Sequence, residues 1–452
     1  MSDDPTVSDQ VSRADQFWPH LTAPEAWLWA KIRHVSGHVV ECDGLQAPMG
    51  AMCEIETDDP AAPNVPAEVV AFSDQTLKLI PFSDTVGVSR ESRIRLVNRR
   101  VGLPVGPHLL GRVIDPLGNP LDGQPLAHPR FTPHFFGRSI PALKRKAVKT
   151  PLDVGVRAIN GVLTLAKGQR VGLIAGSGVG KSTLLGMMTR HTVADVVVLA
   201  LIGERGREAG EFLAESLGPE GLRKAVVILA TSDCASVMRR QAAEVAHLVA
   251  EYFRDQGNDV LLLCDSLTRI AHAQREIGLA TGEPPTNKGY PPSVFSDLPK
   301  LIERGGPGDG EGSITSVYTV LSEHDEGMDP IVEVARASLD GQIMLSRELA
   351  DSGVYPAINL RGSISRLASK VLSHHVIKMA TDFRRLWSLY EANRDLIMVG
   401  AYEQGTDPEL DRAIAIRPMM LDFLRQEATE SCSMDQAAAA MAQIVARGQH
   451  GH

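Results

Sequence analysis

Cysteine is scarce in this chain of 452 residues, and no two cysteines are closely spaced. The five residues are scattered, odd in number and without a Cys-x-x-Cys motif; they are Cys42, Cys53, Cys234, Cys264 and Cys432. This pattern argues against the disulfide framework of small secreted proteins, and no Cys/His spacing resembles a zinc site. We therefore expect free thiols in a reducing cytoplasm.

The sequence also lacks long apolar runs and an excess of positive charge. No stretch approaches the roughly 20 consecutive apolar residues that span a bilayer. The first residues, MSDDPTVSDQVSRAD, are acidic and polar, unlike a secretory or transit signal. The formal net charge of −9 argues against a nucleic-acid-binding protein. We expect a cytoplasmic protein that reaches a membrane only by docking on a partner.

Aromatic residues are few, yet three of the four tryptophans gather near the N-terminus, at Trp18, Trp27 and Trp29. They allow two interpretations, because they can pack onto their own domain or serve as anchors for a partner. The acidic residues before them have no apolar periodicity, which is typical of disorder. We predict a flexible segment at the start of the chain, and both interpretations of the tryptophans stay open at this point.

Two regions of different composition follow. Residues 31–100 contain short alternating runs broken by turn residues, such as SGHVVECDG and GAMCEIE, and this predicts a small barrel or sandwich. Residues 101–150 are rich in glycine and proline, as in GLPVGPHLLGRVIDPLGNPLDG, and predict a connection between domains.

From Pro151 onward, apolar strands alternate with stretches of helical length. Runs such as RVGLIAG, DVVVLALIG and DVLLLCDS predict a parallel sheet covered on both faces, and hence an α/β domain over residues 151–366.

Strand signals vanish after Leu367. Asp407-Pro408 looks like a helix start, and Ser433-x-x-Gln436 like a capping box, so residues 367–452 are predicted to be helical.

A phosphate-binding loop is predicted in the stretch GLIAGSGVGKSTLLGMM. It matches the P-loop pattern G-x-x-x-x-G-K-[ST] except that Ala175 replaces the first glycine, and it lies between an apolar strand and a helix. Its backbone N–H groups can form an anion nest at a helix N-terminus. Lys181 is expected at the β- and γ-phosphates and Ser182 at Mg²⁺. The expected nucleotide-binding residues of the loop are Ala175, Gly176, Ser177, Gly178, Val179, Gly180, Lys181, Ser182 and Thr183.

Two acidic residues follow apolar strands. Asp265 ends DVLLLCD, at the strand end where open α/β sheets bind ligands, and is a candidate to organise the metal. The alternative for Asp265 is a helix N-cap. Glu204 follows DVVVLALIG and is a candidate to polarise an attacking water. Taken alone, Glu204 also fits a solvated surface residue.

Four longer motifs carry a family resemblance. They are AGSGVGKSTLLGMM, GERGREAGEFL, CDSLTRIAHAQREIGLATGEPPTNKGYPPSVFSDLPKLIERGG and DGQIMLSRELADSGVYPAINLRGSISR. Together they resemble the ATPases of bacterial type III protein export, most closely the flagellum-specific export ATPases, which are related to the α and β subunits of rotary ATP synthases. The resemblance implies an α/β fold: a central RecA-like P-loop nucleotide-binding domain, an N-terminal small β-barrel and a C-terminal helical domain.

The resemblance also implies roles for single residues. Lys181 and Glu204 match the phosphate-binding lysine and the catalytic glutamate, and Asp265 matches the Walker B aspartate. Arg205 looks like a residue that faces the γ-phosphate, and Arg269 looks like part of the magnesium-water shell. The cofactors implied are ATP and Mg²⁺.

Two further matches concern the nucleobase and the neighbouring subunit. Tyr355, in GVYPAINL, is similar to the tyrosine that stacks on adenine. Arg366, which closes GSISR, looks like an arginine finger contributed by a neighbouring subunit of a homohexamer. Such a finger accelerates hydrolysis by about 10³–10⁵. An isolated protomer would then bind ATP but hydrolyse it poorly.

The function implied is that of a P-loop ATPase (ATP and water to ADP and phosphate) of the flagellar type III export apparatus, associated peripherally with the inner membrane. The resemblance implies that residues 1–30 form a flexible segment that binds a regulatory stalk-like export protein, with Phe17, Trp18 and Trp27 as candidate anchors. The other partners implied are a central coiled-coil stalk protein, the export gate, chaperones and export substrates, with no nucleic acid. The ATPase of a virulence-type (injectisome) secretion system is the alternative.

Two more distant functions share this chemistry. A hexameric RNA-translocating ATPase is disfavoured by the acidic charge and by the lack of an aromatic, basic RNA-binding module near the N-terminus. A non-catalytic subunit of a rotary ATPase is disfavoured because Lys181, Glu204 and Asp265 are all present. The acidic rotor-contacting loop of ATP synthase β subunits has no evident counterpart in RQEATESCSMDQ, which argues against inferring rotation by analogy.

Overall fold

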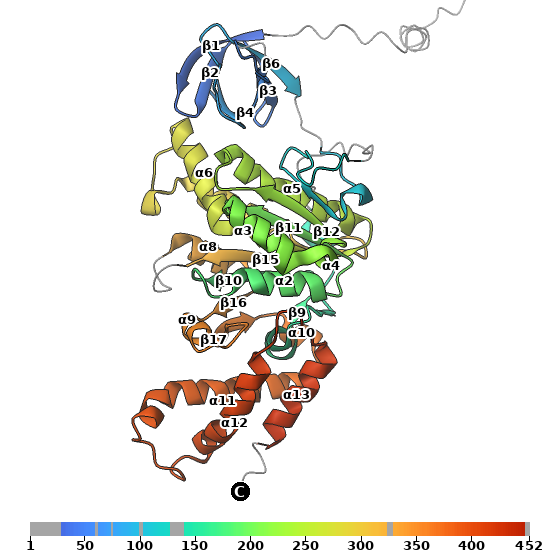
Figure 1. Cartoon of the computed structure of the whole chain (residues 1–452), viewed down its shortest axis with the longest axis vertical. Helices are drawn as coiled ribbons and strands as arrows, with labels where there is room; N and C mark the ends of the chain where they lie inside the picture. Colours follow the sequence, from blue (N-terminus) through green and yellow to red (C-terminus); the bar gives the residue numbers. More distant parts are fainter. Residues whose placement is uncertain are drawn as a thin grey trace, which may run out of the picture. The chain divides into compact units, whose positions relative to one another are not determined.

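A computed structural model describes residues 29–58, 62–73, 76–98, 103–126, 140–322 and 329–447 (Figure 1). The chain divides into two compact units, Met1–Arg99 and Arg100–His452. We propose a finer division of the chain into domains, with boundaries at residues 30, 100, 150 and 366. The predicted partner-binding segment lies outside the described residues except for Trp29 and Ala30.

A closed six-stranded barrel forms the first unit (Figure 1). Its strands are β1 (Trp29–Ser36), β2 (Val39–Asp43), β3 (Met52–Ile55), β4 (Val65–Ser73), β5 (Thr76–Pro81) and β6 (Arg93–Asn98). They pair in the order β1-β2-β5-β4-β3-β6, and β6 pairs back with β1. Alternate residues point inward, so that Ile55, Leu79 and Ile94 are fully buried. Of the two architectures predicted from the alternating pattern, the structure is the barrel.

A nine-stranded sheet forms the centre of the second unit. Its strands are β7 (Arg112–Ile114), β10 (Arg170–Ala175), β11 (Val196–Ile202), β12 (Ala225–Ala230), β13 (Asp259–Asp265), β14 (Gly306–Pro307), β15 (Ser313–Leu321), β16 (Gly341–Leu345) and β17 (Ile358–Ser365). The order is β17-β16-β10-β15-β13-β11-β12-β7, with β14 paired to β15. The sheet is parallel except for β17 on β16 and β14 on β15.

The short strand β7 belongs to the stretch that was predicted as a connection. It pairs in parallel with β12, so residues 101–150 contribute the edge strand of the central sheet as well as loops. Only three residues form this strand. The residues on both sides of β7 are rich in glycine and proline, so the sequence shows no alternating strand pattern there.

Helices cover both faces of the sheet (Figure 1). They are α2 (Lys181–His191), α3 (Gly206–Glu211), α4 (Gly218–Leu222), α5 (Ser236–Asp255), α6 (Leu267–Thr281), α7 (Pro292–Ile302), α8 (Pro330–Ser338) and α9 (Arg347–Asp351). Along β11, Leu199 and Leu201 enter one buried cluster with α2, whereas Val198 and Ala200 enter another with α5. This alternation shows that the sheet is buried on both faces, as predicted.

Short elements complete the unit. They are the helical turns η1 (Pro107–Leu109), η2 (Ala142–Lys144), η3 (Ile159–Leu163), η4 (Phe212–Leu217) and η5 (Asn287–Gly289), and the strand pair β8 (Pro151–Leu152) and β9 (Leu165–Ala166).

The chain ends in four helices, α10 (Ala368–Val371), α11 (His374–Met398), α12 (Pro408–Leu424) and α13 (Met434–Arg447). Both predicted helix starts are confirmed. The Asp407 carboxylate accepts hydrogen bonds from the backbone of Glu409 and Leu410. Ser433 and Gln436 bond reciprocally, since each backbone N–H donates to the other's side chain, at 2.9 and 3.3 Å. Among the described residues, no helix combines the length and apolar composition needed to cross a membrane.

Candidate active site

The predicted phosphate loop connects β10 to α2. Gly178 and Gly180 have φ angles of 75° and 88°, in the left-handed region that favours glycine. Ala175 is the last residue of β10 and is buried at 1% exposure. The alanine that replaces the first glycine of the motif therefore occupies a strand position, where a side chain is tolerated. The loop itself, residues 176–180, keeps three glycines.

Lys181 brings the two predicted acidic residues together. Its Nζ lies 2.6 and 2.8 Å from the two carboxylate oxygens of Asp265 and 2.9 Å from Glu204 Oε1. Burial alone would lower the pKa of Lys181, but the charges and hydrogen bonds of the two acids outweigh burial and raise it. Lys181 is therefore a stable cation at the centre of the site.

The sheet explains why these side chains meet. Asp265 ends β13, Glu204 follows β11 by two residues, and the phosphate loop follows β10. These strands run parallel in one sheet, so their carboxyl ends lie along the same edge, where α/β sheets bind ligands. The alternative of Asp265 as a helix N-cap is wrong, because Ser266 caps α6 by accepting a hydrogen bond from the Arg269 backbone.

Arg269 packs against the turn that follows β11. Gly203, with a φ of 71°, lies so close that a Cβ on it would be 3.0 Å from the Arg269 Cβ and Cγ atoms. Arg269 Nε is buried and has no hydrogen-bond partner within the described part of the chain. The aliphatic part of the Arg269 side chain thus packs on Gly203, the residue before Glu204, and its Nε still has a donor to satisfy.

Two polar residues of the site were missed by sequence reasoning. Thr319 of β15 is fully buried, and its Oγ1 donates a 2.6 Å hydrogen bond to Asp265 Oδ1. Arg347, the first residue of α9, donates through Nη2 to the Ser177 carbonyl in the phosphate loop, at 2.9 Å. A signal existed for Thr319, because it is a polar residue within the apolar strand SITSVYTVL. Arg347 carried no comparable signal.

A cavity of about 290 Å³ lies between the phosphate loop and Tyr355. The Tyr355 ring is 45% exposed, and a Cβ on Gly180 would lie 3.2 Å from it. The lining residues are Gly180, Thr183, Leu184, Met187, Gly353, Tyr355, Pro356, Arg425, Gln426, Glu427 and Ala428. An exposed aromatic ring beside a phosphate loop can stack on a planar base. Sequence reasoning missed the wall formed by residues 425–428.

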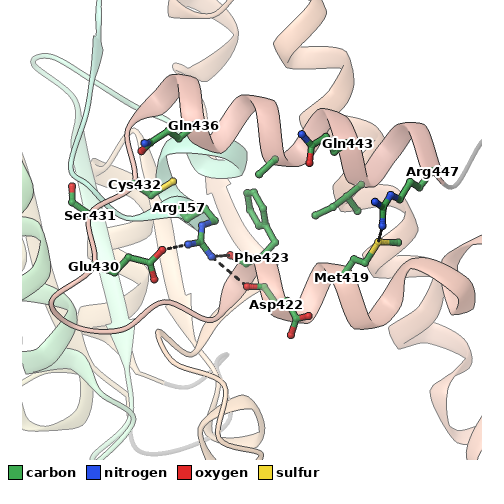
Figure 2. Close-up of a pocket in the computed structure, with 12 residues that line it drawn as sticks. Arg157, Met419, Asp422, Phe423, Glu430, Ser431, Cys432, Gln436, Gln443 and Arg447 are labelled. Atoms are coloured by element: carbon green, nitrogen blue, oxygen red, sulfur yellow. Dashed lines mark hydrogen bonds and ion pairs between the residues drawn. The ribbon is translucent and has the colours of Figure 1, made fainter.

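Gln426 fixes this wall. Its backbone N–H donates to the Tyr355 carbonyl at 2.9 Å, and its buried side chain accepts from the Arg157 N–H at 2.7 Å and donates to the Gly155 carbonyl at 2.8 Å. The Arg157 guanidinium in turn donates to carbonyls at the end of α12 and pairs with Glu430 (Figure 2). The C-terminal helices are thus fastened directly beside the cavity.

A second cavity, of about 510 Å³, is lined by Arg157 (Figure 2). Helices α12 and α13 form its walls with Met419, Phe423 and Ile444, and the connection between them adds Glu430 and Cys432. Loop 425–432 therefore lines both cavities.

The structure does not bring the two other predicted arginines to Lys181. Arg205 is 78% exposed and pairs with Glu208 at 3.0 Å. Arg366 is exposed and directly follows β17. Ser182 and Thr183 are exposed in the first turn of α2, beside Lys181.

Comparisons with known proteins show to which family this chain belongs. The nucleotide-binding domain of the ATP synthase alpha/beta family matches residues 155–365, and the T3SS EscN ATPase C-terminal domain matches residues 372–443. The flagellum-specific ATP synthase of Pseudomonas aeruginosa is 49% identical over 421 residues, 93% of either chain, and that of Salmonella typhimurium is 47% identical, covering 92% and 94%. The type 3 secretion system ATPase of Xanthomonas euvesicatoria is 47% identical, covering 88% and 90%.

Solved structures give the same result. The assembled ATPase EscN of the enteropathogenic E. coli type III secretion system has a TM-score of 0.86 and 41% identity, covering 92% of this chain and all of EscN. EscN in complex with its central stalk EscO has a TM-score of 0.84 and 40% identity, with the same coverage. The expected RecA-like centre with a small barrel and C-terminal helices is confirmed. This chain belongs to the ATP synthase alpha/beta family, among the flagellum-specific and type III secretion ATPases, and is an ATP-hydrolysing enzyme.

Proposed function

We propose that this chain hydrolyses ATP at the interfaces between neighbouring copies in a homohexamer, in the service of bacterial flagellar protein export. The observation that carries the shared site is the separation of Arg366 from Lys181. Strand β16 runs parallel to β10, with Gln342 beside Gly172, and β17 runs antiparallel to β16, with Ser365 beside Gly341.

The strand directions therefore put Arg366 and Lys181 at opposite ends of strand β10. Arg366 follows the end of β17, next to the start of β10, whereas the phosphate loop follows the end of β10. Strand β10 has six residues and spans about 20 Å, which an arginine side chain cannot bridge. An exposed Arg366 therefore suits the active site of a neighbouring copy, as an arginine finger would.

Within one protomer, Lys181 is the group that responds to nucleotide binding. Phosphate oxygens compete for its ammonium, so binding of ATP releases Asp265 and Glu204 from the ion pairs they form with Lys181. The freed Glu204 carboxylate then orients the attacking water and accepts its proton at a carboxylate oxygen. Arg205 is exposed and pairs with the half-buried Glu208, so its guanidinium can turn toward the γ-phosphate, and Tyr355 stacks on adenine.

The oxygen donors at the site fit Mg²⁺. Magnesium prefers carboxylate, hydroxyl and water oxygens, and the Ser182 hydroxyl and the Asp265 carboxylate are of this kind. The buried Arg269 Nε, which has no partner among the described residues, provides a donor for a water in the surrounding shell. When bound, the ion would neutralise charge that develops on the β- and γ-phosphates.

The proposed partners follow from the relatives. EscN is known in an assembled form and with its central stalk EscO, which supports a ring with a central coiled-coil stalk protein for this chain. We extend the proposal to a regulatory stalk-like protein at the N-terminus, the export gate, chaperones and flagellar substrates. The protein would be cytoplasmic and would meet the inner membrane through these partners.

Two experiments test the proposal. The first measures ATP hydrolysis per protomer against protein concentration for the wild type, Glu204→Gln and Arg366→Ala. We expect the wild-type rate to rise cooperatively, and both variants to bind nucleotide but hydrolyse it at least about 10³-fold more slowly. A flat wild-type rate together with an active Arg366→Ala variant contradicts the shared site.

The second experiment separates the flagellar function from the virulence-type alternative. A strain without this gene should lose motility and the export of flagellar proteins. Retained motility with loss of effector secretion would instead support the injectisome function, for which the Xanthomonas euvesicatoria relative is the precedent.

A further inference from the structure

We infer that the buried Gln169 and the half-buried Ser365 form a latch that positions Arg366 for the neighbouring active site. This inference rests on the proposed function, in which Arg366 acts in trans. Gln169 directly precedes β10, and Ser365 is the last residue of β17, so the latch joins the start of the P-loop strand to the residue before the finger.

The contacts of the latch are made by the Ser365 hydroxyl and the Arg366 backbone N–H. Gln169 Nε2 donates to Ser365 Oγ at 3.0 Å, and the Ser365 hydroxyl donates to the Thr164 carbonyl at 2.9 Å. The Arg366 N–H donates to the Asp340 carbonyl at 3.0 Å. Gln169 Oε1 accepts from the Ala166 N–H at 2.9 Å, which fixes the orientation of the amide.

Asp340, the carbonyl partner of Arg366, is itself held firmly. Its carboxylate accepts from the Arg170 backbone N–H at 3.0 Å and from Arg170 Nε at 3.2 Å, while its own N–H donates to the Arg170 carbonyl at 2.8 Å. The next residue, Gly341, lies so close to β17 that a Cβ would be 2.4 Å from the Ile364 carbonyl oxygen. The backbone before Arg366 is therefore pressed against β16 without room to shift.

Burial gives the latch its specificity. Gln169 is 0% exposed, and a buried amide is costly unless its donors and acceptors are bonded. Its amide nitrogen donates to Ser365 Oγ at 3.0 Å and to the Asp340 carbonyl at 3.4 Å, the same carbonyl that accepts from the Arg366 N–H. The result is a fixed backbone that ends in an exposed guanidinium, as expected for a group that must reach a partner in a defined geometry.

The variants separate positioning from folding. Ser365→Ala removes the hydroxyl with the smallest change in volume, Ser365→Thr retains it, and Gln169→Met keeps the shape of the buried side chain without its polar atoms. We expect Ser365→Ala and Gln169→Met to lower kcat by about 10–100-fold, because a misplacement of 1 Å costs about 10²-fold. KM for ATP should change little, and Ser365→Thr should restore the rate.

Mixed rings test whether the defect lies in the donated finger. Each variant is mixed with Lys181→Ala, whose phosphate loop is inactive but whose Arg366 is intact. In randomly mixed rings about a quarter of the sites combine an intact loop with a neighbour's intact finger, since the contact is head-to-tail. Mixtures of Ser365→Ala with Lys181→Ala should therefore be more active than either protein alone.

The mixture of Arg366→Ala with Lys181→Ala distinguishes the possible failures. If that mixture gains activity and the Ser365→Ala and Gln169→Met mixtures do not, the latch is wrong and the shared site stands. If even the Arg366→Ala mixture stays inactive, the proposed finger in trans is wrong, and the latch loses its role with it. Ser365→Ala with wild-type kcat also overturns the latch.

Discussion

Thr319 and Lys181 share one oxygen atom of Asp265. Both the Thr319 hydroxyl and the Lys181 ammonium lie 2.6 Å from Asp265 Oδ1, and the ammonium also contacts Oδ2 at 2.8 Å. Thr319 approaches from the neighbouring strand β15, inside the protein, whereas Lys181 approaches from the phosphate loop. When ATP draws Lys181 away, Thr319 remains as the bond that fixes the orientation of the carboxylate.

We predict that Thr319→Val lowers kcat about tenfold and raises the Mg²⁺ concentration needed for half-maximal activity. Loss of a hydrogen bond to a charged group is worth about 1.5–3 kcal/mol, and the carboxylate would be free to rotate. Hydrolysis measured against Mg²⁺ concentration tests this, with Thr319→Ser expected to restore the wild-type curve.

Thr315→Val is the matched control for Thr319. Thr315 is equally buried on the same strand, but its hydroxyl accepts from the Gly168 backbone, away from the site. We expect Thr315→Val to lower the free energy of unfolding without moving the Mg²⁺ dependence. Identical Mg²⁺ curves for Thr319→Val and the wild type would show that Thr319 has only a structural role.

Arg347→Gln should weaken binding of ADP and ATP about fivefold, or about 1 kcal/mol, because the Ser177 carbonyl loses its partner in an exposed part of the loop. Isothermal titration with both nucleotides measures this. Arg385→Gln is the control, since Arg385 is an arginine of α11 that pairs with Glu409 away from the loop. An equal loss of affinity in both variants would assign the effect to net charge.

Tyr355→Ala should weaken ATP binding by about 1–3 kcal/mol, the usual contribution of one base stacked on an aromatic ring. Tyr355→Phe keeps the ring and should bind as the wild type does. The two variants are compared by titration with ATP and with inorganic tripolyphosphate, which has no base. If tripolyphosphate loses as much affinity as ATP, the ring acts by supporting Gly180 instead.

The buried His247 predicts an acid-sensitive fold. Its Nδ1 lies 2.7 Å from the Ala243 carbonyl and therefore carries the proton, so Nε2 accepts from the Tyr318 hydroxyl at 2.8 Å. Burial, together with the charge of Arg304, lowers the pKa of His247 to about 3. The unfolded chain, with a pKa near 6.5, binds a proton that the folded chain does not, so stability is complete above pH 6.5 and decreases as pH falls toward 3.

At pH 5 this difference amounts to about 2 kcal/mol of unfolding free energy. His247→Gln should flatten the decrease between pH 7 and pH 5, whatever its effect at neutral pH. Urea unfolding of both proteins at the two pH values gives the comparison. The prediction is wrong if the pH dependence of the variant equals that of the wild type.

The phosphate loop, the two acids and the helix caps could be predicted from sequence because each depends on neighbours in the chain. The glycine spacing around Lys181 and the strand before Asp265 are local patterns, and so is the Asp407-Pro408 helix start. The alternating pattern does not distinguish a barrel from a sandwich, because closure of the barrel depends on the pairing of β1 with β6, whose residues lie far apart in the sequence.

Contacts between distant segments account for what was missed. Gln426 reaches Gly155 across 271 positions and Arg347 reaches Ser177 across 170, and neither leaves a periodic signal. The edge strand β7 was missed because three residues among glycines and prolines are too few for a period. The roles of Arg205 and Arg366 came from the resemblance alone, since the sequence pattern gave no reason to select them.

The closed barrel carries a consequence for how copies of the chain can be joined. With β6 paired to β1, the described strands of the barrel have no free edge to offer to another chain. Neighbouring barrels in a ring would then touch through side chains, which can exchange partners as subunits shift, whereas a shared backbone ladder would have to break. A coupling of this kind allows each subunit to change shape in turn while the ring stays intact.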